Sequence, residues 1–107
     1  MLEAQLAKIL QSLRAGLAQA LGDQLESVIL YGSQARGETR ADSDIDVLVI
    51  VRDEADYGEL IQRTSALVST LSLEYDVVIS RAFASKSRFD RERSPFFLNV
   101  RREGVAV

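Results

Sequence analysis

The sequence predicts one small α/β domain, and three observations lead to that fold class. The 107 residues, 47% hydrophobic and 27% charged, suit a single globular domain that spans residues 1–107. Two long stretches place leucine and isoleucine at helical spacing. Three short runs rich in β-branched residues lie between and after these stretches, so helical and extended segments alternate along the chain.

The first half of the chain is predicted to form a helix and two strands. A stripe of leucines over residues 2–21 predicts an amphipathic helix that Gly22 ends. Residues 25–31, LESVILY, predict a short strand. Residues 33–43, rich in Gly, Ser, Arg and Asp, predict a loop or a short helical turn. The run DIDVLVIV, residues 44–51, predicts a strand that is buried on both faces over its apolar second half.

The second half is predicted to add a helix, a strand and a charged, mostly helical end. Asp56 and Glu59 have the spacing of a capping box at the start of a second amphipathic helix. Residues 75–80, YDVVIS, predict the third strand. Residues 85–93 are charged and predicted to be helical. Over residues 94–104, a serine N-cap and a first-turn proline predict a short helix that ends near a glycine.

The composition excludes several kinds of chemistry. The chain has no cysteine and no histidine, so thiolate and imidazole metal sites and nucleophiles that depend on either residue are excluded. Carboxylates, hydroxyls, arginines and the backbone remain. Neither a signal peptide nor a membrane span is recognisable, so we expect a cytoplasmic protein without a membrane partner.

Charge is unevenly distributed along the chain. Residues 1–80 hold 6 basic and 13 acidic side chains, whereas residues 81–107 hold 7 basic and 3 acidic ones. The acidic body argues against direct nucleic-acid binding. The basic segment, residues 81–102, is either a solvated face or, with Phe96 and Phe97 among its charges, a surface for a protein partner.

Three aspartates are candidate metal ligands. Asp44 and Asp46 stand two residues apart on a predicted strand, so they project from one face and repel each other unless a cation lies between them. Asp76, the second residue of the third predicted strand, would join them if the two strands are neighbours. A site of oxygen ligands alone favours Mg²⁺ or Mn²⁺. The alternatives are a solubilising turn for the pair and a solvated strand start for Asp76.

A candidate phosphate site precedes these aspartates. Gly32 and Ser33 follow a strand, where free backbone N–H groups and the serine hydroxyl can bind phosphate and the missing Cβ allows a close approach. Arg36 could neutralise phosphate oxygens, with a surface salt bridge as an equal alternative, and Arg40 is a weaker candidate. Asp42 is out of register with the aspartate pair and is interpreted as a loop residue. Phosphate binding beside metal-binding carboxylates is the arrangement used in nucleotidyl transfer.

These motifs resemble the signature of the polymerase-β nucleotidyltransferase superfamily: Gly32-Ser33, ten intervening residues, then Asp44-Ile45-Asp46. The longer string YGSQARGETRADSDIDVLVIV, residues 31–51, is similar to the minimal nucleotidyltransferase branch, whose members are typically antitoxins paired with HEPN-domain toxins. The likeness extends to the leading helix, to Asp76 and to the closing Arg-Glu-Gly-Val of residues 102–105. The resemblance implies a polymerase-β-like core with a small mixed sheet flanked by helices.

The resemblance also implies a role for each candidate residue. Gly32 and Ser33 would hold the triphosphate of ATP, the substrate. Asp44 and Asp46 would bind two Mg²⁺ ions, and Asp76 would bind the catalytic ion and serve the incoming hydroxyl.

The implied function is that of an antitoxin enzyme. It would transfer AMP from ATP to a hydroxyl, expected to be a tyrosine, of a partner HEPN toxin. The alternative is an antitoxin that neutralises its partner by binding alone. An antibiotic-modifying adenylyltransferase is disfavoured, because 107 residues cannot hold the second domain that builds its acceptor pocket.

Overall fold

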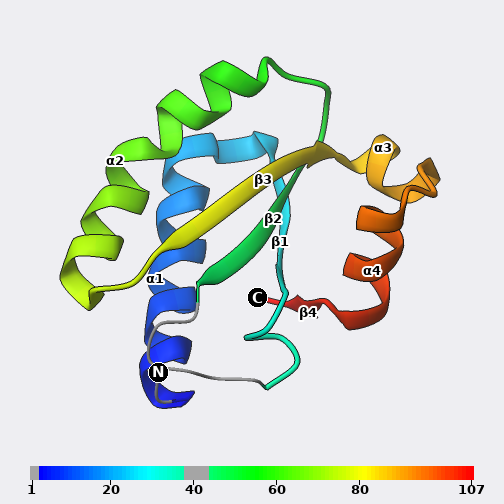
Figure 1. Cartoon of the computed structure of the whole chain (residues 1–107). Coiled ribbons are helices and arrows are strands. Elements are labelled where there is room, and N and C mark those ends of the chain that lie inside the picture. Colours follow the sequence, from blue (N-terminus) through cyan, green and yellow to red (C-terminus); the bar gives the residue numbers. More distant parts are fainter. Residues whose placement is uncertain (1–2, 38–43) are drawn as a thin grey trace.

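The computed structural model describes residues 3–37 and 44–107 and confirms the α/β class. Within these residues, four strands pair in the order β3-β2-β1-β4; β2 and β3 are parallel, and β1 is antiparallel to both of its neighbours (Figure 1). No helix in the described part of the chain has the length and hydropathy needed to cross a membrane. The elements are α1 (Glu3–Leu21), a 3-10 turn (Gly22–Gln24), β1 (Leu25–Tyr31), β2 (Ile45–Val51), α2 (Tyr57–Tyr75), β3 (Ile79–Ser85), α3 (Lys86–Arg91), α4 (Pro95–Glu103) and β4 (Val105–Ala106).

Helices α1 and α2 cover one face of the sheet, and the main core lies beneath them (Figure 1). Alternate residues of each strand point toward these helices. Burial of apolar surface, worth about 25 cal/mol per Å², holds the two layers together. The buried stripe of α1, which the leucine spacing predicted, consists of Leu6, Ile9, Leu13, Leu17 and Leu21.

Helix α4 covers part of the opposite face. It begins at Ser94, whose side chain accepts a hydrogen bond from the Phe97 N–H at 3.4 Å, as the serine–proline pair predicted. Phe97 and Val100, each 2% exposed, pack against Leu48 and Ile50 of β2. Strand β2 is therefore buried on both faces. The chain then returns to β1, where β4 pairs over two residues, too short a strand to be recognised in the sequence.

The third strand differs from the prediction. The sequence predicts it over residues 75–80, but β3 spans Ile79–Ser85. Helix α2 continues to Tyr75 because its apolar side chains continue to pack against the core. Asp76 then caps this helix in the left-handed conformation, with φ 52° and ψ 53°, and its N–H donates to the Ser72 carbonyl oxygen. Asp76 is a helix cap, so its predicted place in a strand is wrong.

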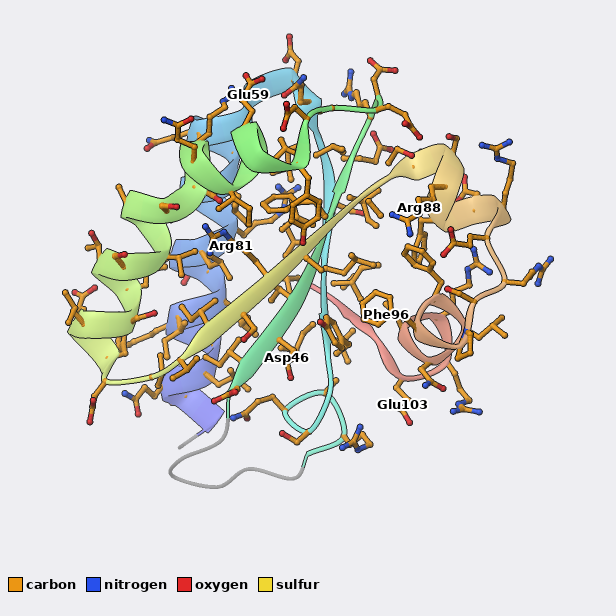
Figure 2. The ribbon with its side chains drawn as sticks, turned by 45° about the horizontal axis from the view of Figure 1, so that its top comes forward. Asp46, Glu59, Arg81, Arg88, Phe96 and Glu103 are labelled. Atoms are coloured by element: carbon orange, nitrogen blue, oxygen red, sulfur yellow. The ribbon has the colours of Figure 1, made fainter. Side chains whose placement is uncertain are left out.

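Arg81 joins β3 to α2 instead of facing outward. Its side chain points toward α2 (Figure 2), where Nε donates to Thr64 Oγ1 at 2.7 Å. Its Nη2 donates to the Ile61 carbonyl oxygen at 3.0 Å and to Ser65 Oγ at 3.1 Å. Burial lowers the pKa of this guanidinium. The exposed basic side chains of residues 81–102 therefore lie on α3, on α4 and in the link between them, where Arg93 is exposed.

Candidate active site

Tyr31, Asp46 and Ser80 stand in one row across the sheet. Asp46 on β2 lies opposite Tyr31 on β1 and opposite Ser80 on β3. All three side chains leave the sheet on the face away from α1 and α2, because the next residue of β2, Val47, is fully buried beneath those helices. The row lies near the start of β2, on the side of the sheet where α4 stands (Figure 2).

Gly32 ends β1, and its backbone lies directly against Asp46. Its φ of +77° is readily accessible to glycine, and a Cβ here would lie 2.6 Å from Asp46 Oδ2. Any side chain at this position would push the carboxylate away. The sequence predicts a close approach of this backbone to a phosphate; the group that it approaches in the structure is the Asp46 carboxylate.

The turn after Gly32, residues 33–37, presents several amides together. The Arg36 N–H donates to the Gly32 carbonyl oxygen at 3.3 Å, and the Gly37 N–H donates to the Gln34 carbonyl oxygen at 3.3 Å. Within the described part of the chain, the N–H groups of residues 33–35 make no backbone hydrogen bond. Successive free amides beside a serine hydroxyl can bind an anion such as phosphate.

Gln34, in the same turn, was not singled out by the sequence. Its side chain is 4% exposed, yet neither Oε1 nor Nε2 has a hydrogen-bond partner among the described residues. A buried polar group without a partner is costly and calls for a functional explanation. A glutamine in a loop carries no pattern from which this burial could have been inferred.

The Asp46 carboxylate is unfavourably placed when charged. Burial, followed by the negative charge of Asp44, raises the pKa of Asp46 above its ordinary value. A divalent cation would offset both effects, because it replaces lost hydration and neutralises the repulsion. Mg²⁺ is commonly held by one or two carboxylates together with substrate phosphates. Asp44, Asp46 and the adjoining turn therefore fit a magnesium–phosphate group.

Asp76 is not brought to this pair. It is exposed at the end of α2, three residues before β3 begins, and the β3 residue opposite Asp46 is Ser80. No three potential ligands among the described residues (His, Cys, Asp or Glu) form a group that could hold a metal ion. Among the described residues the three carboxylates are therefore not brought together, because the longer helix leaves Asp76 outside the sheet.

Arg36 links the turn to α4. Its Nη1 forms an ion pair with Glu103 Oε2 at 3.2 Å, so the salt bridge that the sequence left open is present. Both residues of the pair line a small pocket together with Gly32. Arg40 and Asp42 lie outside the described residues.

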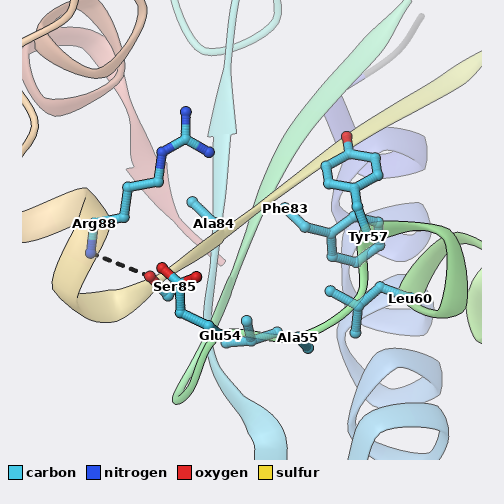
Figure 3. A pocket seen from close by; sticks show the side chains of 9 residues that line it. Glu54, Ala55, Tyr57, Leu60, Phe83, Ala84, Ser85 and Arg88 are labelled. Carbon is cyan, nitrogen blue, oxygen red and sulfur yellow. Dashed lines mark hydrogen bonds between the residues drawn. The ribbon is translucent and has the colours of Figure 1, made fainter.

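A pocket of about 210 Å³ lies at the end of β2 and β3 that is far from Asp46 (Figure 3). Tyr57 and Phe83 line one side of it and Arg88 the other. It is separated from Asp46 by the length of β2, since its lining includes Val51 at the far end of that strand. We therefore assign the candidate active site to the Gly32–Asp46 end of the sheet.

Comparison with known proteins agrees with this geometry. The family described as "Nucleotidyltransferase domain" matches residues 6–101. The chain belongs to this family. Over 103 residues the nucleotidyltransferase is 32% identical to "Putative protein adenylyltransferase MJ0141" of Methanocaldococcus jannaschii, a match that covers 96% of this chain and 99% of that protein.

Two solved structures share the fold of this nucleotidyltransferase. A structure described as "a putative nucleotidyltransferase from Sulfolobus solfataricus" has a TM-score of 0.66, with 20% identity over 97% of this chain and 82% of the other. The structure "toxin-antitoxin with AMP-PNP" has a TM-score of 0.62, with 19% identity over 90% of this chain and 70% of the other. The superfamily and the mixed sheet flanked by helices, which the resemblance implied, are thereby confirmed.

The setting of Asp46 predicts the effect of its replacement on stability. A carboxyl whose pKa is raised in the folded state lowers stability when ionised, and this cost disappears as the pH falls below the unfolded pKa. Asp46→Asn should therefore melt at a higher temperature than the parent at pH 7, with a smaller difference at low pH. Thermal melts across this pH range, with the exposed Asp53→Asn as control, measure the effect. A lower melting temperature at pH 7 would mean that the carboxylate holds the turn in place.

Proposed function

We propose that this nucleotidyltransferase is a Mg²⁺-dependent protein adenylyltransferase that acts as an antitoxin in the cytoplasm. It transfers AMP from ATP to a hydroxyl, expected to be a tyrosine, of a partner toxin of the HEPN class. The observation that carries the proposal is the contact of the Gly32 backbone with the Asp46 carboxylate, which unites the phosphate-binding turn with the metal-binding residues. The name of the relative MJ0141 and the toxin–antitoxin neighbour with AMP-PNP support it.

Different residues of the site would bind the phosphates and the metal ions. The amides of residues 33–35 and the Ser33 hydroxyl hold phosphate oxygens, and Arg36 adds positive charge. Asp44 and Asp46 would hold two Mg²⁺ ions, which supply charge neutralisation and polarise the phosphate that is attacked.

The transfer forms one bond and breaks another. The acceptor oxygen bonds to the α-phosphorus of ATP, the bond between the α- and β-phosphates breaks, and pyrophosphate leaves. A tyrosine hydroxyl, with a pKa of about 10, must lose its proton during this step. The Mg²⁺ ions that Asp44 and Asp46 would hold would favour the ionised form of this hydroxyl, and its proton would pass to water.

Ser80 favours a second candidate function, an antitoxin that neutralises its partner by binding alone. The residue opposite Asp46 on β3 is this serine, and not the third carboxylate that the resemblance implied. Fewer ligands for the metal would weaken catalysis without affecting the docking of a partner. The two functions differ in whether the partner is chemically modified.

The transfer itself can be measured directly. Incubation with ATP, Mg²⁺ and a HEPN-type protein encoded beside this one should add adenylate to a tyrosine of that protein, detected by mass spectrometry. The double variant Asp44→Asn/Asp46→Asn should still bind the partner but leave its mass unchanged, because the metal site is lost. If this inactive variant neutralises the toxin in cells as well as the parent does, the antitoxin acts by binding alone.

Metal binding distinguishes Asp76 from the Asp44–Asp46 pair. Titration with Mn²⁺ in the presence of AMP-PNP should show binding that Asp44→Asn/Asp46→Asn abolishes. Asp76→Asn should leave the affinity unchanged, because that residue caps α2 away from the pair. Ser80→Asp should raise the affinity for Mn²⁺ because it adds a carboxylate opposite Asp46. A large loss of affinity for Mn²⁺ in Asp76→Asn would show that Asp76 belongs to the metal site.

Replacing each of two glycines, Gly32 and Gly37, tests whether the contact between Gly32 and Asp46 is needed for nucleotide binding. Gly32 and Gly37 both have φ +77°, so alanine is similarly strained at each, at about 1–2 kcal/mol. A Cβ at Gly37 would meet no atom of the described residues within 4 Å, whereas one at Gly32 would displace the Asp46 carboxylate. Gly32→Ala should abolish AMP-PNP binding in calorimetry, and Gly37→Ala should largely retain it. Equal losses would show that backbone strain, and not contact with Asp46, controls binding.

A further inference from the structure

A small pocket of about 180 Å³ opens between the end of β1 and helix α4. Tyr31, Gly32 and Arg36 line one side, and α4 contributes Phe96, Asn99 and Glu103 on the other. Pockets that enclose a whole drug-sized ligand measure roughly 300–1,000 Å³, so this one suits a single ring system.

Phe96 lines this pocket with an aromatic ring that two neighbouring rings hold in place. Its side chain is 40% exposed although it lies on a helix whose other face is core. The ring meets Tyr31 edge-on, with centroids 5.3 Å apart at 90°, and meets Phe97 at 5.4 Å and 67°. Contacts on two sides hold the ring in place, so little conformational entropy is lost when a planar group stacks on it.

The pocket is continuous with the phosphate-binding turn. Gly32 lines the pocket and also lies against Asp46, and Arg36 belongs to both the turn and the pocket wall. A ring bound against Phe96 and a phosphate bound at Ser33 can therefore belong to one molecule.

Polar groups at the rim indicate which kind of ring fits. Asn99 Oδ1 accepts a hydrogen bond from Arg102 Nη2 at 2.7 Å, which orients the amide and leaves Nδ2 as a donor. Purine rings carry acceptor nitrogens at their edges and have a larger stacking surface than pyrimidines. Glu103 and Arg36, paired at 3.2 Å, stand across the rim beside Asn99.

We infer that the pocket beside Phe96 binds the purine base of the nucleotide substrate, with Phe96 as its stacking platform and Asn99 as a donor to a ring nitrogen. The inference rests on the proposed function, because it assumes that a nucleoside triphosphate is the ligand. It assigns base selectivity to α4, an element on which the phosphate and metal residues do not lie.

Calorimetric titration of the full chain with four nucleotides and inorganic triphosphate, each with Mg²⁺, tests the assignment. The parent should bind ATP and GTP more tightly than CTP, UTP or triphosphate. Phe96→Ala should weaken ATP binding about ten-fold and narrow the gap between purines and pyrimidines. Its affinity for triphosphate should be unchanged, because that probe has no base. Phe96→Tyr, which keeps an aromatic ring and the fold, should bind ATP as the parent does.

Leu98→Ala is the matched control. Leu98 stands on the same helix at 43% exposure but does not line the pocket, so its replacement should leave all the affinities unchanged. Equal ATP affinity in the parent and Phe96→Ala would overturn the inference, as would an equal loss of triphosphate binding. Loss of partner binding alone in Phe96→Ala would assign the pocket to the protein interface instead. A parent that binds neither ATP nor triphosphate would overturn the proposed function as well.

Discussion

The contact between the Gly32 backbone and the Asp46 carboxylate is the constraint on which the site depends. Amides at the start of a turn attract an anion, whereas two neighbouring carboxylates attract a cation. Because Gly32 has no Cβ, the turn and the Asp46 carboxylate lie side by side. A group that attracts an anion therefore adjoins one that attracts a cation. A nucleotide phosphate that carries a divalent cation satisfies both at once, which neither a bare anion nor a bare cation does.

The position of Asp46 depends in turn on hydrophobic burial. Ile45 and Val47 on either side of it are fully buried beneath the helices, and Leu48 is fully buried under α4. A shift of β2 by one residue would turn Asp46 into the core and an apolar residue toward the ligand. The packing of β2 between two layers therefore determines which face carries the carboxylate, and the core and the site cannot change independently.

Helix α4 connects the second, smaller core with the edge of the site. Phe97 and Val100 anchor it on β2, while Phe96 and Glu103 face the end of β1 and the turn of residues 33–37. Because one rigid helix carries both sets of side chains, a change in its packing also moves the wall of the pocket. Two basic side chains of this region also pack on its rings, Arg88 over Phe97 at 5.1 Å and Arg101 over Phe89 at 5.0 Å.

Short-range patterns in the sequence were enough to predict most of the fold and part of the candidate site. Leucine spacing, the Asp56 and Ser94 caps and the apolar run of β2 indicated the helices and central strands, because each is set by near neighbours. Gly32 and Asp46 were likewise visible as a spaced motif. Only the tertiary structure decided the end of α2, where packing extends the helix, moves Asp76 out of the sheet and leaves Ser80 opposite Asp46. Tyr31 meets Phe96 across 65 residues of sequence, and such contacts between distant segments leave no periodic signal in the chain.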